Sequence, residues 1–81
     1  MRIEVQLFAG ARDLAGAGST LIELADTATI QELKQALARS HPELTQLVRH
    51  SRIAVNSAYA ADQDTITAED EVALIPPVSG G

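Results

Sequence analysis

The chain has 81 residues, a net charge of −5 and no cysteine, and Phe8 and Tyr59 are its only large aromatic residues. This length provides for one domain with a single core, which must be packed from aliphatic side chains. The acidic charge repels phosphate backbones, so nucleic acid is excluded as an expected partner. The lack of cysteine excludes a disulfide framework, a cysteine metal site and a thiol nucleophile, and it fits a reducing cytoplasm.

The N-terminal part of the chain predicts two strands. Ile3, Val5 and Leu7 alternate with polar residues, which is the period expected for a strand with one face on the core. Residues 10–19 are rich in glycine and predict a turn region, and residues 20–24 predict a second strand that forms a hairpin with the first. No apolar run here or later has the length of a signal peptide or a membrane span. We therefore expect a cytoplasmic protein with no membrane partner.

The middle of the chain predicts one main helix. Thr29 and Glu32 have the spacing of a capping box, in which each side chain satisfies a free backbone N–H. Apolar residues then recur at helical spacing. Pro42 disfavours helical geometry at the residue before it, so the helix should end near Ser40. Residues 44–48 predict a short second helical turn.

The C-terminal part predicts two more strands. Residues 53–55 form a short one, followed by a turn at Asn56-Ser57, and residues 71–75 form the last. The order β-β-α-β-β predicts an α+β fold in which one mixed sheet packs on one helix and the last strand can lie beside the first. We expect residues 1–75 to form this domain and residues 76–81 to form an extended tail.

The side chains predict no self-contained active site. His41 and His50 lack cysteine neighbours and a His-x-x-x-His spacing, so surface or helix-end histidines are expected rather than metal ligands. The acidic residues between positions 62 and 71 lack the spacing of an EF-hand. The serines lack the nucleophile-elbow motif, and the glycines at 10–18 lack the lysine of a phosphate loop. We expect no metal or cofactor on this chain and no catalysis by the chain alone.

The tail differs in character from the rest of the chain. It consists of Pro76, Pro77, Val78, Ser79, Gly80 and Gly81. Two prolines favour an extended start, and two glycines remove the side chains that would block a narrow channel or a reacting centre. A terminal Gly-Gly alone is equally consistent with a frayed chain end. The combination of two prolines at the start of the tail and two glycines at its end favours the terminal carboxylate of Gly81 as the functional group.

The strand period also predicts an apolar patch at the base of the tail. If the apolar residues of the first and last strands alternate as described, Phe8 and Ile75 fall on the face away from the core. Together with Tyr59 they would form a docking surface for a partner. A bulge or a strand end could instead return Phe8 to the core, and the sequence leaves both alternatives open.

The sequence resembles a known family most strongly at residues 70–81, which read Asp-Glu-Val-Ala-Leu-Ile-Pro-Pro-Val-Ser-Gly-Gly. This ending is similar to the last strand and tail of the small subunits of molybdopterin synthase, which are ubiquitin-like β-grasp sulfur carriers. Weaker matches at Phe8-Ala9, residues 12–16 and Val55-Asn56 extend the resemblance over essentially the whole chain. The chain departs from the family at Glu69, where glycine is common, and at Ser57, where glycine or a longer polar residue is common, and both departures bear on turns.

The resemblance implies a sulfur-transfer cycle that partner proteins run. An E1-like adenylyltransferase would use ATP to activate the Gly81 carboxylate, and sulfur would then replace AMP to give a thiocarboxylate. The large subunit of molybdopterin synthase would direct this sulfur onto cyclic pyranopterin monophosphate in molybdenum cofactor biosynthesis. Phe8, Tyr59, Ile75 and the tail residues from Pro76 to Gly80 would contact these partners. Three alternatives stay open: the sulfur carrier of thiamine thiazole synthesis, a ubiquitin-like protein modifier, and an interaction domain with an inert tail.

Overall fold

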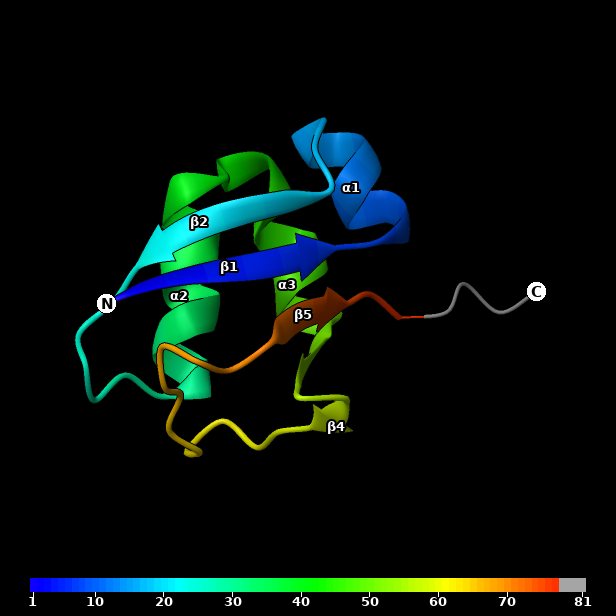
Figure 1. Cartoon of the computed structure of the whole chain (residues 1–81). Helices are drawn as coiled ribbons and strands as arrows, with labels where there is room; N and C mark the ends of the chain where they lie inside the picture. The colour runs from blue at the N-terminus through cyan, green and yellow to red at the C-terminus, as the bar shows by residue number, and fades with distance from the viewer. Residues whose placement is uncertain (78–81) are drawn as a thin grey trace.

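The computed structural model of the chain describes residues 1–77. Its elements are β1 (Arg2–Leu7), α1 (Ala9–Ala15), β2 (Ser19–Glu23), α2 (Ile30–Ser40), the 3-10 helix η1 (Pro42–Leu44), α3 (Thr45–His50), β3 (Arg52–Val55), β4 (Ala58–Tyr59) and β5 (Val72–Ile75) (Figure 1). The strands form one sheet in the order β2-β1-β5-β3-β4, with β5 parallel to β1 and the other neighbours antiparallel. The predicted α+β architecture is confirmed, including the position of the last strand beside the first.

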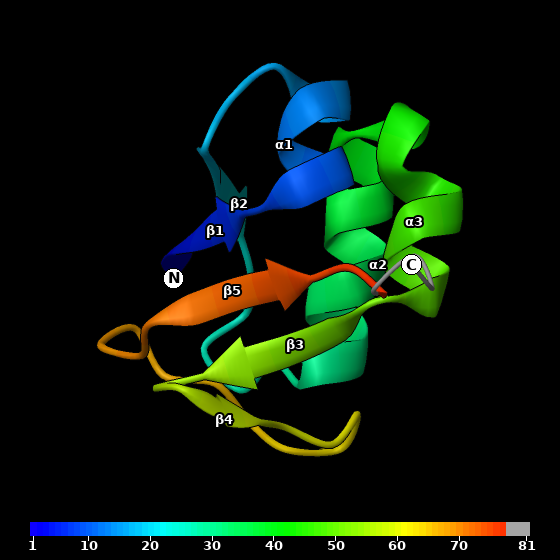
Figure 2. The same cartoon turned by 90° about the vertical axis from the view of Figure 1, so that its right-hand side faces the viewer.

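The sheet has one covered face and one open face. Helices α2 and α3 lie against one side, and the other side carries no element of the described chain (Figure 2). Ile3, Val5 and Leu7 of β1 point toward the helices and are at most 1% exposed, while the residues between them are exposed. The predicted alternation of β1 is therefore confirmed. Strand β2 lies one residue earlier than predicted and pairs with β1 as the expected hairpin neighbour.

The predicted turn region at residues 10–19 is wrong in its first part, because α1 occupies Ala9–Ala15. The segment is rich in alanine, the best helix former, and Ala11 is buried in the core. Gly16 ends the helix in the left-handed conformation with φ of 72°, and its N–H donates to the carbonyl of Arg12 at 2.9 Å. A glycine in this conformation is the usual helix stop, so it marks a helix end here and not a loop.

The capping box at the start of α2 is confirmed. Thr29 Oγ1 accepts a hydrogen bond from the Glu32 N–H at 3.3 Å, and Glu32 Oε1 accepts one from the Thr29 N–H at 3.0 Å. The helix ends at Ser40, as predicted from Pro42. Its buried face packs on the sheet through Ile30, Leu33, Ala36 and Leu37. The short helical turn predicted after it is present as η1 and α3.

The predicted order lacks strand β4, which the structure contains. A tight turn after β3 brings β4 beside it. Asn56 and Ser57 have φ of 51° and 71°, so the two residues between β3 and β4 are both left-handed. Two consecutive left-handed residues form the compact turn that favours hairpins. Asn56 also donates to Asp70 Oδ1 at 3.0 Å and accepts from the Glu71 N–H at 2.9 Å. These bonds fix the hairpin to the chain segment that enters β5.

Candidate functional site

The open face of the sheet carries a row of four side chains, and the two in the middle are short. Gln6, Ala73, Ala54 and Tyr59 are successive partners across β1, β5, β3 and β4. Partnered residues on neighbouring strands point to the same face, so these four side chains form one line across the sheet. The two central residues are alanines, and the larger side chains around them stand higher. The sequence therefore builds a concave surface from an otherwise regular sheet.

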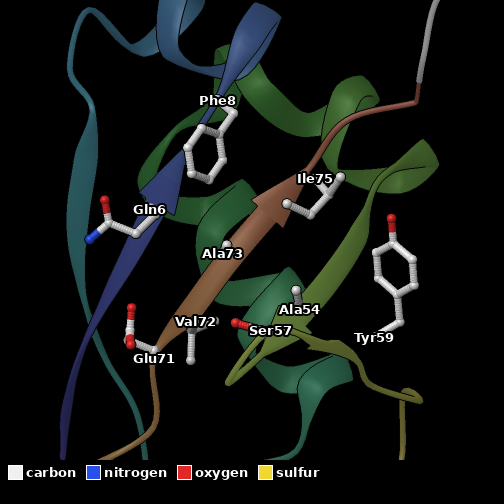
Figure 3. A pocket seen from close by; sticks show the side chains of 9 residues that line it. All are labelled: Gln6, Phe8, Ala54, Ser57, Tyr59, Glu71, Val72, Ala73 and Ile75. Atoms are coloured by element: carbon white, nitrogen blue, oxygen red, sulfur yellow. The ribbon is translucent and has the colours of Figure 1, made fainter.

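A groove of about 470 Å³ lies over this row (Figure 3). It is lined by Gln6, Phe8, Ala54, Ser57, Tyr59, Glu71, Val72, Ala73 and Ile75. The parallel strands β1 and β5 run toward the same end of the groove, so Phe8 and Ile75, which follow and close these strands, lie together at that end. Glu71 precedes β5 and lies at the opposite end. The groove is apolar near the tail and polar far from it.

Phe8 and Ile75 lie where the strand period places them, on the face away from the core, and Tyr59 lines the same groove. Phe8 and Tyr59 are 48% and 57% exposed, and Ile75 is half-buried. Phe8 keeps extended backbone angles, with φ of −127° and ψ of 160°, before α1 begins. The alternation of β1 therefore continues through Phe8, and no bulge returns its ring to the core. The structure brings the three apolar residues to one groove.

Arg52, which no sequence motif marks, lies beside this apolar end. Arg52 pairs with Ile75 across β3 and β5, and its guanidinium carbon lies 3.8 Å from the centroid of the Tyr59 ring. A cation above an aromatic face at this distance is attracted by the ring. The turn at residues 56–57 places Ala54 opposite Tyr59, so Arg52 is a diagonal neighbour on the same face. That register is the signal that could have identified the pair from the sequence.

The described tail begins at this end of the groove. Strand β5 ends at Ile75, and the chain continues through Pro76, which is half-buried, and Pro77, which is exposed. Val78, Ser79, Gly80 and Gly81 lie outside the described residues. The roles predicted for them therefore stay predictions.

The comparisons with known proteins give the family. The model of the ThiS family matches residues 5–81 of the chain. This chain belongs to the ThiS family. A molybdopterin synthase sulfur carrier subunit from Chlamydomonas reinhardtii is 37% identical over 83 residues, and the match covers 100% of both chains. Small archaeal modifier protein 1 from Haloferax volcanii is 33% identical over 87 residues, which cover 98% of this chain and 100% of the modifier.

A solved structure shows the same fold for this ThiS-family chain. The crystal structure of SAMP1 from Haloferax volcanii superposes with a TM-score of 0.87 at 31% identity, over 100% of both chains. The predicted ubiquitin-like β-grasp fold is thereby confirmed. The family match also includes the four residues that follow Pro77, so the Gly-Gly ending falls within the matched region.

Hydrogen bonds hold the polar end of the groove in this ThiS-family chain. The backbone N–H of Thr67 and the side-chain amide of Asn56 donate to the Asp70 carboxylate at 2.8 and 3.0 Å. Both bonds favour the charged form and hold the pKa of Asp70 below its usual range. The carboxylate thus fixes the loop that leads into Glu71 and β5.

The two histidines of the chain lie at helix ends, as the sequence predicts. His41 follows α2, where its Nε2 lies 2.9 Å from Thr20 Oγ1 and its Nδ1 lies 3.4 Å from Glu43 Oε2, and His50 closes α3. Within residues 1–77, no group of three or more His, Cys, Asp or Glu residues is placed to hold a metal ion. Over the same residues, no helix combines the length and the apolar character needed to cross a bilayer.

Proposed function

We propose that this chain is the sulfur-carrier subunit of molybdopterin synthase and that a thiocarboxylate on Gly81 donates its sulfur to cyclic pyranopterin monophosphate. The similarity to a carrier subunit of that name over the full length supports this role. The observation that carries the proposal is the open groove at the base of the tail, where Phe8, Tyr59 and Ile75 are arranged for a partner to cover them.

The chemistry needs no side chain of this protein. A carboxylate is a poor electrophile until its oxygen becomes part of a leaving group, so an E1-like adenylyltransferase first transfers AMP from ATP to the Gly81 carboxylate and releases pyrophosphate. Hydrosulfide, or a donor that delivers sulfur at the same oxidation level, then displaces AMP and leaves a thiocarboxylate. The thiocarboxylate is a soft nucleophile, so the lack of cysteine in the chain is no obstacle. Two rounds supply both sulfur atoms of the dithiolene.

The groove would set the reach of the tail. A partner that docks on Phe8 and Ile75 fixes the start of the tail, and the six residues 76–81 then extend at most about 20 Å from that point. The reacting centre of the large subunit should therefore lie within this distance of Ile75. Exposed aromatic and aliphatic residues that a partner desolvates are the usual anchors of such interfaces.

A second candidate role is that of a ubiquitin-like protein modifier, favoured by the similarity to small archaeal modifier protein 1. In this role the Gly81 carboxylate would end in an isopeptide bond to a lysine of another protein. Lys34 is the only lysine of this chain, its side chain is 25% exposed, and its Nζ lies 3.0 Å from Asp62 Oδ1. Chains of modifier that are linked through lysine would therefore depend on Lys34 alone.

Reconstitution separates the two roles. The chain is combined with the adenylyltransferase, ATP, a sulfur donor, the large synthase subunit and cyclic pyranopterin monophosphate, and the formation of molybdopterin is measured. We expect molybdopterin only when ATP and the carrier are both present. Protein conjugates without any molybdopterin would contradict the carrier role and favour the modifier. Replacing the large subunit by the thiazole synthase of thiamine synthesis tests the thiamine alternative in the same assay, and neither product nor conjugates would favour an interaction domain with an inert tail.

A further inference from the structure

Arg52 differs from the other cationic residues of the chain in its surroundings. The chain has six lysines and arginines. Arg2 and Lys34 form ion pairs with Glu23 and Asp62. Arg12, Arg39 and Arg49 lie on the helices α1, α2 and α3. Among residues 1–77, no carboxylate lies within ion-pairing distance of Arg52. It is thus the unpaired cation of the open sheet face, next to the groove.

Tyr59 holds the Arg52 side chain in a defined position. The guanidinium carbon lies 3.8 Å from the ring centroid, while the Arg52 residue as a whole stays exposed. A guanidinium that rests on an aromatic ring has lost part of its rotamer freedom before any partner arrives, so less entropy is lost when it binds. Its N–H groups remain available at the edge, and their fork geometry matches a carboxylate.

The position of Arg52 relates it directly to the tail. Arg52 is the partner of Ile75, the last residue of β5, so its side chain lies beside the point where the tail leaves the sheet. Glu71 lies four residues before Ile75 and on the same face of the sheet. Along an extended strand, this separation from Ile75 is about 13 Å. A cation, Arg52, therefore lies beside the tail end of the groove, and an anion, Glu71, lines its far end. This polarity distinguishes one orientation of a partner from the reverse.

We propose that Arg52, held by Tyr59, binds a carboxylate of the large synthase subunit beside the entry of the tail and so sets the orientation in which the subunit docks. The inference rests on the proposed function and deepens it, because it assigns an acidic residue to the partner surface that meets this end of the groove. A partner turned end for end would bring the same carboxylate against Glu71, where like charges repel.

Calorimetric titration of the large subunit with four forms of the full chain tests the inference: the parent, Arg52→Gln, Arg52→Lys and Arg39→Gln. Arg39 is exposed in the last turn of α2, so its variant changes the net charge equally on another element. We expect Arg52→Gln to bind about 10- to 100-fold more weakly, the typical effect of losing a hydrogen bond to a charged group. Arg39→Gln should stay within about twofold of the parent, since exposed charges away from the contact contribute little.

Two further measurements test whether Arg52 binds the carboxylate through its planar guanidinium. Arg52→Lys should recover only part of the affinity, because lysine keeps the charge but lacks the planar fork. Raising the salt concentration should weaken the parent more than Arg52→Gln, because salt screens the ion pair that the variant lacks. Parent-like binding by Arg52→Gln, or an equal loss in Arg39→Gln, would overturn the inference and leave the proposed function standing. A parent chain that does not bind the large subunit would overturn both.

Discussion

The two faces of β5 differ in what their side chains do. Val72 and Leu74 belong to the core and are at most 1% exposed, whereas Ala73 and Ile75 are half-buried and border the open groove. The inward residues stabilise the fold because they leave water on folding. The outward ones gain the same stabilisation only when another molecule covers them. One strand thus serves both folding and docking, and substitutions on its two faces should separate stability from partner binding.

The largest expected effect on stability is on the inward face. Leu74→Ala removes a fully buried side chain at the centre of the sheet and should lower the free energy of unfolding by about 2–5 kcal/mol. Urea unfolding measures this loss, with Ile75→Ala as the control on the outward face of the same strand. The control should lose less stability but bind the large subunit more weakly. Equal losses of stability in the two variants would contradict the division between the faces.

On the outward face, Phe8→Arg should weaken binding to the large subunit by about 2 kcal/mol or more, because it removes an aromatic anchor from the groove. The unfolding midpoint should stay near that of the parent, since the ring is exposed. Leu21→Arg is the matched control, because Leu21 is 59% exposed on β2 but does not line the groove. If Phe8→Arg bound the large subunit as tightly as Leu21→Arg does, Phe8 would not belong to the interface.

A smaller effect on stability is expected at the start of α2, which touches neither the groove nor the tail. Thr29→Ala removes the hydroxyl that caps the helix and should lower the free energy of unfolding by about 0.5–2 kcal/mol. Formation of the thiocarboxylate at a permissive temperature should stay unchanged. Thr27→Ala changes an exposed threonine two residues earlier and serves as the control. Identical unfolding midpoints for the two variants would show that the cap contributes nothing.

The smallest effect is expected at the polar end of the groove and depends on pH. The pKa of Asp70 is lowered in the folded chain, first by the backbone N–H of Thr67 and then by the Asn56 side chain. The folded state therefore binds fewer protons than the unfolded state, so this stabilisation is present above the unfolded pKa of about 4 and is lost as the pH falls below it. Unfolding midpoints of the parent should fall more steeply in this range than those of Asp70→Asn. Parallel pH profiles would contradict the assignment.

Much of the fold could be predicted because its signals are local. The alternation in β1 and the capping box at Thr29 involve residues a few positions apart, and both have the predicted geometry. Helix α1 was missed because Gly10 within it and Gly16 and Gly18 after it resemble a loop, while its packing through Ala11 depends on distant parts of the chain. Strand β4 was missed because two residues carry no periodic pattern.

The candidate site was predictable to a similar extent. Parity along β1 and β5 places Phe8 and Ile75 on the open face, and both line the groove. The low alanines that make the groove concave, and the stacking of Arg52 on Tyr59, depend on the pairing of β3 with its two neighbours. The β3–β4 register follows from the predicted turn at residues 56–57, but the pairing of β3 with β5 is a property of the assembled sheet.

The intact mass of three forms of the chain tests the role of the terminal carboxylate most directly. The parent, a form without Gly81 and a form with one added residue are each incubated with the adenylyltransferase, ATP and a sulfur donor. We expect the exchange of one oxygen for sulfur in the parent alone. An added residue displaces the activated carbon by up to about 3.3–3.6 Å, and a misplacement of about 1 Å can already cost a hundredfold in rate. Sulfur incorporation into the extended form at the rate of the parent, without trimming, would contradict the account.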